Sequence, residues 1–114
     1  CNATEKRQKM IIDLEKYNFL DKSLIIVVGD KTSNNSTKLY EMAKRLNKTD
    51  VIFIDNISEL NFLNLKQYDE IHLFSGTSTP KSIVDELYNL LLDLDNINIE
   101  KLNSKLTLIE YVKN

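Results

Sequence analysis

The sequence predicts an α/β fold, a small three-layer parallel sheet with helices on both of its faces. Short apolar runs at 23–28, 51–54 and 70–74 have the length and the β-branched composition of buried strands. Segments with a helical spacing of apolar residues stand before, between and after these runs. Such an alternation is typical of parallel sheets covered by helices, and 114 residues are enough for one domain of this kind.

The first helix is predicted over residues 2–17. Its apolar side chains form one stripe, and charged residues occupy the rest of the surface. The stripe consists of Met10, Ile11, Leu14 and Tyr17. Asn2 followed by Glu5 resembles a capping box. Cys1 would then lie immediately before a helix N-terminus, a position that favours a thiolate as nucleophile or metal ligand.

The first predicted strand, 23–28, ends in Gly29 and leads into a polar loop over 30–36. A second helix follows, with apolar residues at the spacing of one helix face. These are Leu39, Met42, Ala43 and Leu46. The second strand is predicted over 51–54. The pattern of 57–67 is ambiguous and fits one short helix plus a turn.

The third predicted strand, 70–74, contains His72, which we interpret as a packed or edge-exposed residue and not as a catalytic one. Loop 75–80 follows, with Thr79 as the N-cap and Pro80 as the first residue of a long helix. The side chains expected to point inward from this helix are Ile83, Val84, Leu87, Leu90, Leu91 and Leu94. In the tail, residues 106–112 fit a last strand or a short helix.

Composition excludes several classes of function. There are 17 acidic and 15 basic residues, a net charge of −2, which argues against a nucleic-acid surface and a polybasic membrane patch. The longest apolar runs have about five residues where a membrane span needs about 20, and no secretory signal is visible. We therefore expect a cytoplasmic protein without nucleic acid or membrane as partner. The single cysteine excludes an internal disulfide and a zinc site of several thiolates.

Three features are predicted to meet at one edge of the sheet. Right-handed crossovers favour the strand order 2-1-3, in which the strand order reverses between the first and third strands. The loops after those strands, 30–36 and 75–80, then lie beside Cys1 at the carboxyl edge. Hydroxyls and amides at helix N-termini suit an anion such as phosphate, but the same residue types serve simply as helix caps. No Ser–His–Asp triad can be assembled, so we place no catalytic residue in this chain.

Three segments resemble motifs of the 4-hydroxy-3-methylbut-2-enyl diphosphate reductase family. Residues 1–8 read Cys-Asn-Ala-Thr-Glu-Lys-Arg-Gln, and residues 27–36 read Val-Val-Gly-Asp-Lys-Thr-Ser-Asn-Asn-Ser. Residues 75–80 read Ser-Gly-Thr-Ser-Thr-Pro. The order and spacing match the family's Cys-x-Ala-Thr-x-x-Arg-Gln, Val-Val-Gly-x-Lys-x-Ser-x-Asn and Ala-Gly-Ala-Ser-Thr-Pro segments. The resemblance covers residues 1 to about 94.

The resemblance implies an oxidoreductase of isoprenoid biosynthesis. Enzymes of this family reductively remove a hydroxyl from an allylic diphosphate, giving isopentenyl and dimethylallyl diphosphates. They enclose a 4Fe–4S cluster within three pseudo-repeated α/β domains, and a reduced ferredoxin or flavodoxin-type protein supplies the electrons. By this resemblance, residues 1–94 are the C-terminal domain. Residues 95–114 are a tail that packs back or leads into a further domain.

Site residues follow from the same resemblance. Cys1 would be one ligand of the cluster, and Ser33, Asn34, Asn35 and Ser78 would bind the substrate diphosphate. Asn34 departs from the family, which often has Ser or Gly there. The isolated domain should hold no cluster and be inactive, because a single thiolate does not anchor a cubane. The alternatives are a non-catalytic α/β phosphate-binding or interaction module and a thiol protein that uses Cys1 in redox chemistry.

Overall fold

The predicted parallel sheet is present in the computed structural model, which describes residues 2–97 and 107–111. The α-helices are α1 (Asn2–Asp13), α2 (Asn34–Leu46), α3 (Phe62–Leu65) and α4 (Lys81–Ile97), and short 3-10 helices are η1 (Leu14–Lys16) and η2 (Ile57–Glu59). The strands are β1 (Ser23–Val28), β2 (Asp50–Ile54), β3 (Glu70–Ser75) and β4 (Thr107–Tyr111). The ambiguous segment 57–67 thus forms two short helical turns, and the tail contributes a strand.

All four strands run parallel, in the order β2-β1-β3-β4. The predicted order 2-1-3 is therefore confirmed, with β4 added beside β3. The chain passes from β1 to β2 on one side and then returns to β3 on the other, so the strand order reverses between β1 and β3. In the register of this central pair, Val28 lies opposite Ser75, and both strands end there.

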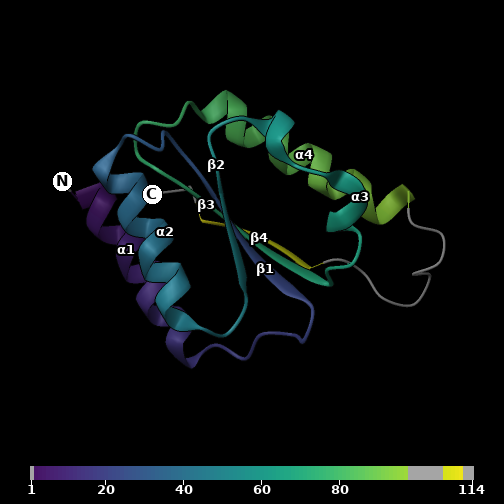
Figure 1. Ribbon diagram of the computed structural model, residues 1–114, viewed down its shortest axis with the longest axis horizontal. Helices are drawn as coiled ribbons and strands as arrows, with labels where there is room; N and C mark the ends of the chain where they lie inside the picture. The colour runs from purple at the N-terminus through teal and green to yellow at the C-terminus, as the bar shows by residue number, and fades with distance from the viewer. Residues whose placement is uncertain (1, 98–106, 112–114) are drawn as a thin grey trace.

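Helices cover both faces of the sheet (Figure 1). One core cluster joins alternate residues of β1, such as Leu24 and Ile26, to α4 and α3. The other joins Ile25 and Val27 to α1 and α2. Every residue of β1 is buried, as a strand enclosed on both faces requires. This central strand anchors the two loops considered below.

Two details of the predicted fourth helix are wrong. The helix begins at Lys81, one residue later than expected, and the Thr79 hydroxyl donates to the Val28 carbonyl oxygen at 3.1 Å instead of capping the helix. Leu90, expected to point inward, is 37% exposed, whereas Leu87 and Leu91 are fully buried. The helix therefore presents a narrower apolar face to the sheet than the spacing of its leucines suggests.

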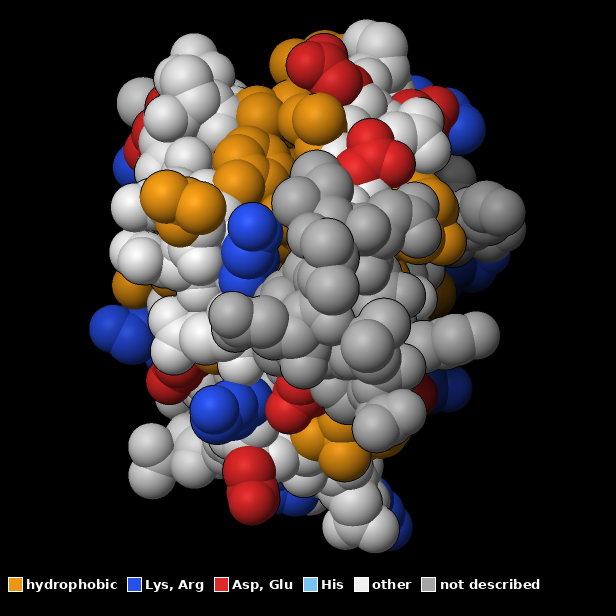
Figure 2. Space-filling view, turned by 90° about the vertical axis from the view of Figure 1, so that its right-hand side faces the viewer, with side chains coloured by type: hydrophobic (Ala, Val, Ile, Leu, Met, Phe, Trp, Pro, Cys, Tyr) orange, Lys and Arg blue, Asp and Glu red, His pale blue; other side chains and the backbone are white. Residues whose placement is uncertain are grey.

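One face of the molecule carries mixed charges among its described residues. Figure 2 shows basic and acidic side chains interspersed on the face seen from the right of Figure 1, with apolar groups beside them. Among the described residues of that face, this distribution agrees with the near-balanced charge of the sequence. Among the described helices, none has the length and apolar character that crossing a membrane requires.

A buried polar network surrounds His72 of β3 and joins it to Glu70, Tyr17 and Tyr111. His72 is fully buried, and its Nε2 lies 2.9 Å from Glu70 Oε2 while its Nδ1 lies 3.0 Å from Tyr111 Oη. The Tyr17 hydroxyl donates to Glu70 Oε1 at 2.9 Å. A neutral imidazole that donates to Glu70 and accepts from Tyr111 satisfies each of these contacts. The interpretation of His72 as a packed residue is confirmed.

Desolvation by burial lowers the pKa of His72, and the nearby Glu70 carboxylate only partly offsets this effect. The unfolded chain therefore binds more protons than the folded chain just below pH 6.5, the ordinary value for histidine. Stability falls as the pH falls below that value. Burial also raises the pKa of Tyr111 to about 12, so Tyr111 keeps its proton throughout this range.

We predict that the midpoint of urea unfolding decreases as the pH is lowered from about 7 to about 5. The chain has one histidine, so the His72→Gln variant should lose most of this pH dependence while carboxylates account for any remainder. Equilibrium unfolding followed by circular dichroism at several pH values measures both. An unchanged slope in His72→Gln would contradict the assignment.

Candidate functional site at the carboxyl edge of the sheet

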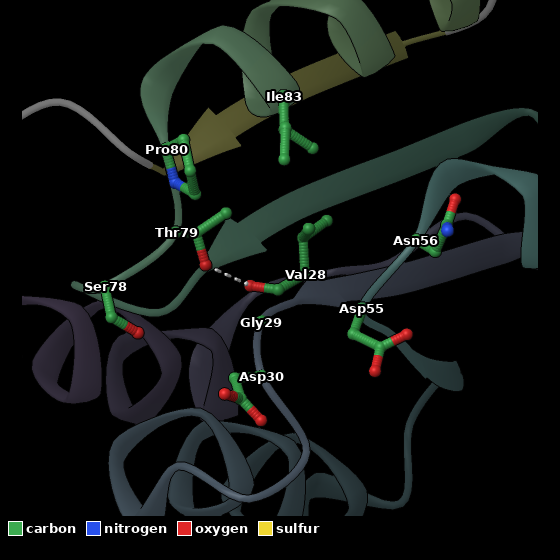
Figure 3. Close-up of a pocket in the computed structure, with 9 residues that line it drawn as sticks. All are labelled: Val28, Gly29, Asp30, Asp55, Asn56, Ser78, Thr79, Pro80 and Ile83. Carbon is green, nitrogen blue, oxygen red and sulfur yellow. Dashed lines mark hydrogen bonds between the residues drawn. The ribbon is translucent and has the colours of Figure 1, made fainter.

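Backbone hydrogen bonds hold together the ends of the three strands at the strand-order reversal. Gly29 N donates to the carbonyl of Ile54, which ends β2, at 2.9 Å. Gly76 N donates to the Val28 carbonyl at 2.9 Å, and the Thr79 hydroxyl donates to the same oxygen at 3.1 Å (Figure 3). The loop after β3 is thus fastened directly to the end of β1.

Ser36, in the first turn of α2, fills the space between the two loops. A Cβ atom added to Gly29 would lie 2.2 Å from Ser36 Oγ, and one added to Gly76 would lie 2.1 Å from it. Neither glycine has a positive φ, so what they supply here is space for close approach. Ser36 is fully buried, and its hydroxyl has no hydrogen-bond partner among the described residues.

The loop from β1 to α2 is shaped by Asp30. Its Oδ1 accepts hydrogen bonds from the backbone N and the hydroxyl of Thr32, at 2.8 and 2.6 Å, and these donors lower the pKa of Asp30. The Asp30 carbonyl accepts from Ser33 N at 2.9 Å. This turn delivers the chain into α2 with Ser33 in extended conformation at the N-cap position.

The Ser33 hydroxyl does not cap α2. It makes no hydrogen bond to the first turn, and only the Ser33 carbonyl enters the helix pattern by accepting from Thr37 N at 3.1 Å. Asn34 and Asn35 are exposed in that first turn. The backbone N–H groups of residues 34–36 have no acceptor within the helix, as at any helix start. The simple capping interpretation of this Ser and Asn cluster therefore does not hold for Ser33.

Ser78 lies on the loop after β3 and is exposed, next to Thr79. The loop closes on itself through a hydrogen bond from Thr79 N to the Gly76 carbonyl at 3.1 Å. Because Ser36 packs against Gly76, the start of α2 and the loop that carries Ser78 touch each other. The structure thus brings the two predicted segments together at the edge that the topology predicts.

A pocket of about 530 Å³ opens beside this junction. Its lining comprises Val28, Gly29, Asp30, Asp55, Asn56, Ser78, Thr79, Pro80 and Ile83. Of the four residues predicted to bind diphosphate, Ser78 alone lines it. Figure 3 shows the Asp30 and Asp55 carboxylates on the side of the pocket away from Pro80 and Ile83. Two carboxylates repel an anion, so the pocket itself is not suited to phosphate.

The acidic side of the pocket is held by a capping box. Glu59 Oε2 accepts from the backbone N of Asp55 and Asn56 at 2.9 and 3.0 Å, and Lys31 Nζ lies 2.9 Å from Glu59 Oε1. A hydrogen bond with the Asp55 side chain, followed by that from Lys31, lowers the pKa of Glu59 to about 2. The hydrogen bond with Glu59 in turn raises the pKa of Asp55.

Helix α1 is attached to the same edge by Arg7. This side chain is only 9% exposed, and its guanidinium donates to the carbonyl of Ser75, the last residue of β3, at 3.1 Å. The helix then runs toward the amino edge, where Tyr17 meets Glu70. Helix α1 therefore begins at the carboxyl edge, as expected. Cys1, which precedes it, lies outside the described residues.

Within residues 2–97 and 107–111, no group of three or more His, Cys, Asp or Glu side chains is arranged to hold a metal ion. The sequence contributes one thiol, at Cys1, whereas a 4Fe–4S cluster is ordinarily held by four cysteine thiolates. The residues of this chain therefore do not fit a complete cluster. They can supply at most one of its cysteine ligands, Cys1.

Sequence reasoning missed Ser36 and the anchoring role of Arg7. The signal for Ser36 was the pair of glycines directly after β1 and β3, since this sequence has only two glycines. Arg7 is the arginine of the motif matched at residues 1–8, but the sequence does not reveal its partner, a backbone carbonyl 68 residues away. The network of Glu70 and Tyr111 around His72 was also missed, since it depends on the placement of β4.

A family model described as LytB protein matches residues 1–92. A Clostridium tetani protein named 4-hydroxy-3-methylbut-2-enyl diphosphate reductase is 39% identical over 114 residues, which are 100% of this chain and 16% of the relative. An Exiguobacterium protein of the same name is 35% identical over 95 residues, covering 83% of this chain and 29% of the relative. The chain thus spans less than a third of the length of either protein.

Two solved structures have a similar fold. One is described as the E-1-hydroxy-2-methyl-but-2-enyl-4-diphosphate reductase from Plasmodium falciparum, with a TM-score of 0.69 and 25% identity over 100% of this chain and 32% of that one. The other is described as (E)-4-hydroxy-3-methyl-but-2-enyl diphosphate reductase, the terminal enzyme of the non-mevalonate pathway. Its TM-score is 0.64, with 27% identity over 80% of this chain and 31% of that one.

The close packing of Ser36 against Gly29 and Gly76 predicts how substitutions there change the stability of the fold. We expect Gly29→Ala and Gly76→Ala each to lower the free energy of unfolding by about 1–3 kcal/mol, because the added methyl group overlaps Ser36. Ser36→Ala alone should be close to neutral, since it removes a buried hydroxyl without a described partner. Chemical denaturation of purified variants measures these changes.

The double variants distinguish the two glycines. Without Oγ, the contact of a Cβ at position 76 becomes 3.3 Å to Ser36 Cβ, so Ser36→Ala should restore most of the stability of Gly76→Ala. The corresponding distance at position 29 is 2.6 Å, so Ser36→Ala should rescue Gly29→Ala poorly. Equal rescue of both, or none, would contradict this packing arrangement.

Proposed function

The chain belongs to the LytB protein family, and on that premise we propose that it is one domain of a 4-hydroxy-3-methylbut-2-enyl diphosphate reductase. The reaction proposed for the whole enzyme replaces the hydroxyl of an allylic diphosphate by hydrogen. The C–O bond breaks, two electrons and two protons enter, and water leaves. A reduced ferredoxin or flavodoxin-type protein supplies the electrons. The products are isopentenyl and dimethylallyl diphosphates.

We assign part of the diphosphate site to this chain. Ser33, Asn34, Asn35 and Ser78 are the proposed ligands. The observation that supports this proposal best is the Ser33 hydroxyl, which occupies the N-cap of α2 without capping it. It stands beside backbone N–H groups and the positive end of a 13-residue helix, where an anion is stabilised. Contact between Ser36 and Gly76 keeps the loop of Ser78 next to this helix start.

The neighbouring carboxylates restrict where an anion can bind near Ser78. Asp30 and Asp55 line the pocket that Ser78 also lines, so their charges disfavour an anion inside this pocket. The pKa of Asp30 is lowered by its bonds to Thr32, which keeps this residue ionised at neutral pH. The acidic pocket thereby helps to define where the diphosphate does not bind.

Cys1 is proposed to contribute one thiolate to a 4Fe–4S cluster, which supplies electron transfer when it is bound. The remaining ligands would come from parts of the enzyme that this chain does not contain. What the described residues contribute is the attachment of α1, the helix that Cys1 precedes, to the end of β3 through Arg7. No catalytic group is assigned within the chain.

The alternative of a non-catalytic phosphate-binding module uses the same loops. It differs in one respect, because it gives Cys1 no role. Iron binding that depends on Cys1 in a complete enzyme therefore separates the two proposals, whereas phosphate binding alone does not.

We predict that pyrophosphate binds the chain and that Ser33→Ala and Ser78→Ala each weaken binding about tenfold. Each variant loses a hydrogen bond to a charged group, about 1.5 kcal/mol or more. Isothermal titration calorimetry measures the dissociation constants. Thr107→Ala is the matched control, since this exposed hydroxyl lies at the start of β4, on the opposite edge. Unchanged affinity in both Ser variants would remove these residues from the proposed site.

The second prediction concerns iron. The purified chain, reconstituted anaerobically with iron and sulfide, should not hold a stoichiometric cluster, because one thiolate does not anchor it. A chimera in which residues 1–94 replace the matching segment of the Exiguobacterium reductase should hold a cluster and reduce the allylic diphosphate. Cys1→Ser in the chimera should sharply reduce both iron content and turnover.

Iron and sulfide analysis, together with the absorbance of the brown chromophore, provides the measurement. Ser82→Ala, on the exposed side of α4 and within the exchanged residues, serves as the control. A stoichiometric cluster in the isolated chain, or an unaffected one in the Cys1→Ser chimera, would contradict the assignment of Cys1.

A further inference from the structure

Arg7 connects two parts of the proposed site that are distant in sequence. It lies in the second turn of α1, and its buried guanidinium bonds to the carbonyl of Ser75 across 68 residues of sequence. Ser75 is 2% exposed and is followed at once by Gly76, whose N–H is bonded to Val28. The contact therefore joins α1 to the rigid base of the loop that carries Ser78.

The cost of this contact argues that its geometry matters. A guanidinium keeps its charge in proteins, and removing it from water is expensive. An apolar side chain would pack α1 against the sheet without that cost, as Ile11 and Leu14 do further along the same helix. What an apolar side chain does not provide is a directional bond to one carbonyl at the end of β3.

Resting on the function proposed above, we propose that Arg7 is a positioning residue that sets the distance between the start of α1 and the Ser78 loop. Cys1 precedes α1, and six helical residues span about 9 Å along a helix axis. A shift of α1 along its axis would therefore move the thiol relative to the diphosphate loop by the same amount. Arg7 prevents this shift by fixing the second turn to Ser75.

A purely packing role makes a different prediction. If Arg7 only fills space, Arg7→Met preserves most of its volume and leaves the distance unchanged. If the directional bond fixes the helix, Arg7→Met alters the distance, and Arg7→Lys, which keeps the charge and a donor, restores it in part. Arg45, the other arginine of the chain, is exposed on α2, so Arg45→Met is a matched control.

The distance is measured with a nitroxide attached to Cys1, the single thiol of the chain. Paramagnetic broadening of the backbone amide signals of Gly76, Thr77 and Ser78 reports how close the start of α1 lies to the loop. The amides of β4 residues 107 and 108, at the amino edge, provide the internal reference. Each variant is prepared as the full 114-residue chain and labelled with the nitroxide. The same chain with a diamagnetic analogue of the label gives the reference spectrum.

We expect strong broadening at 76–78 in the unaltered chain and in Arg45→Met, its loss in Arg7→Met, and partial recovery in Arg7→Lys. The spectra also report folding, so a variant that unfolds is recognised directly. If Arg7→Met unfolds, the comparison passes to Arg7→Lys and Arg7→Gln. Equal broadening in all folded Arg7 variants would overturn the positioning role.

A second readout links the distance to the proposed site. In the Exiguobacterium chimera, Arg7→Met should lower iron content and change the spectrum of the cluster, and Arg7→Lys should recover part of both. The broadening experiment does not involve iron or substrate. If the chimera holds no cluster while Arg7 still sets the distance, the proposed function is contradicted. The broadening result then still supports Arg7 as the residue that fixes α1 relative to the Ser78 loop. If the cluster forms and all Arg7 variants show normal spectra, the inference itself is overturned.

Discussion

The carbonyl oxygen of Val28 receives hydrogen bonds from the backbone of Gly76 and from the hydroxyl of Thr79, at 2.9 and 3.1 Å. This oxygen lies at the end of the central strand, where the strand order reverses. Parallel strands normally diverge into separate loops at this point, so a crevice opens there. Here the loop after β3 is hydrogen-bonded to the last carbonyl of β1. Ser36 packs between the two loops, and its side chain fits only because positions 29 and 76 are glycine. The positions of Ser33 and Ser78 depend on this junction.

Electrostatics divide the carboxyl edge into two sides. Donors gather near the start of α2, where first-turn amides, the Ser33 hydroxyl and the helix dipole favour an anion. Carboxylates gather in the pocket beside β2, where Asp30 and Asp55 lie close to Glu59 and its partner Lys31. Ser78 and Thr79 line the pocket together with these carboxylates. An anion that binds at this edge is therefore drawn to one side by attraction and kept from the other by repulsion.

A second buried arrangement stabilises the opposite half of the domain. Glu70 and His72 lie on β3, and their partners come from η1's C-terminal flank and from β4, through Tyr17 and Tyr111. The ring of Tyr111 also stacks on Phe74 with centroids 4.2 Å apart. These contacts specify where β4 adds to the sheet, because a shifted register would leave Nδ1 of the buried imidazole without Tyr111 as its partner. This network is structural and lies apart from the proposed anion site.

The sequence alone predicted the elements that follow from periodicity. The bounds of β1 were found, as were the parallel topology, the order of the first three strands and the meeting of two Ser-rich loops. Their signals are local apolar runs and helical spacing, and handedness rules supply the order. Three motifs in order also predicted the family. The role of Thr79 and the exposure of Leu90 were predicted wrongly, because each depends on what stands opposite in space. Ser36, the Arg7–Ser75 contact and the His72 network were decided only by the tertiary structure, since their partners lie far apart in the chain and no spacing rule relates them.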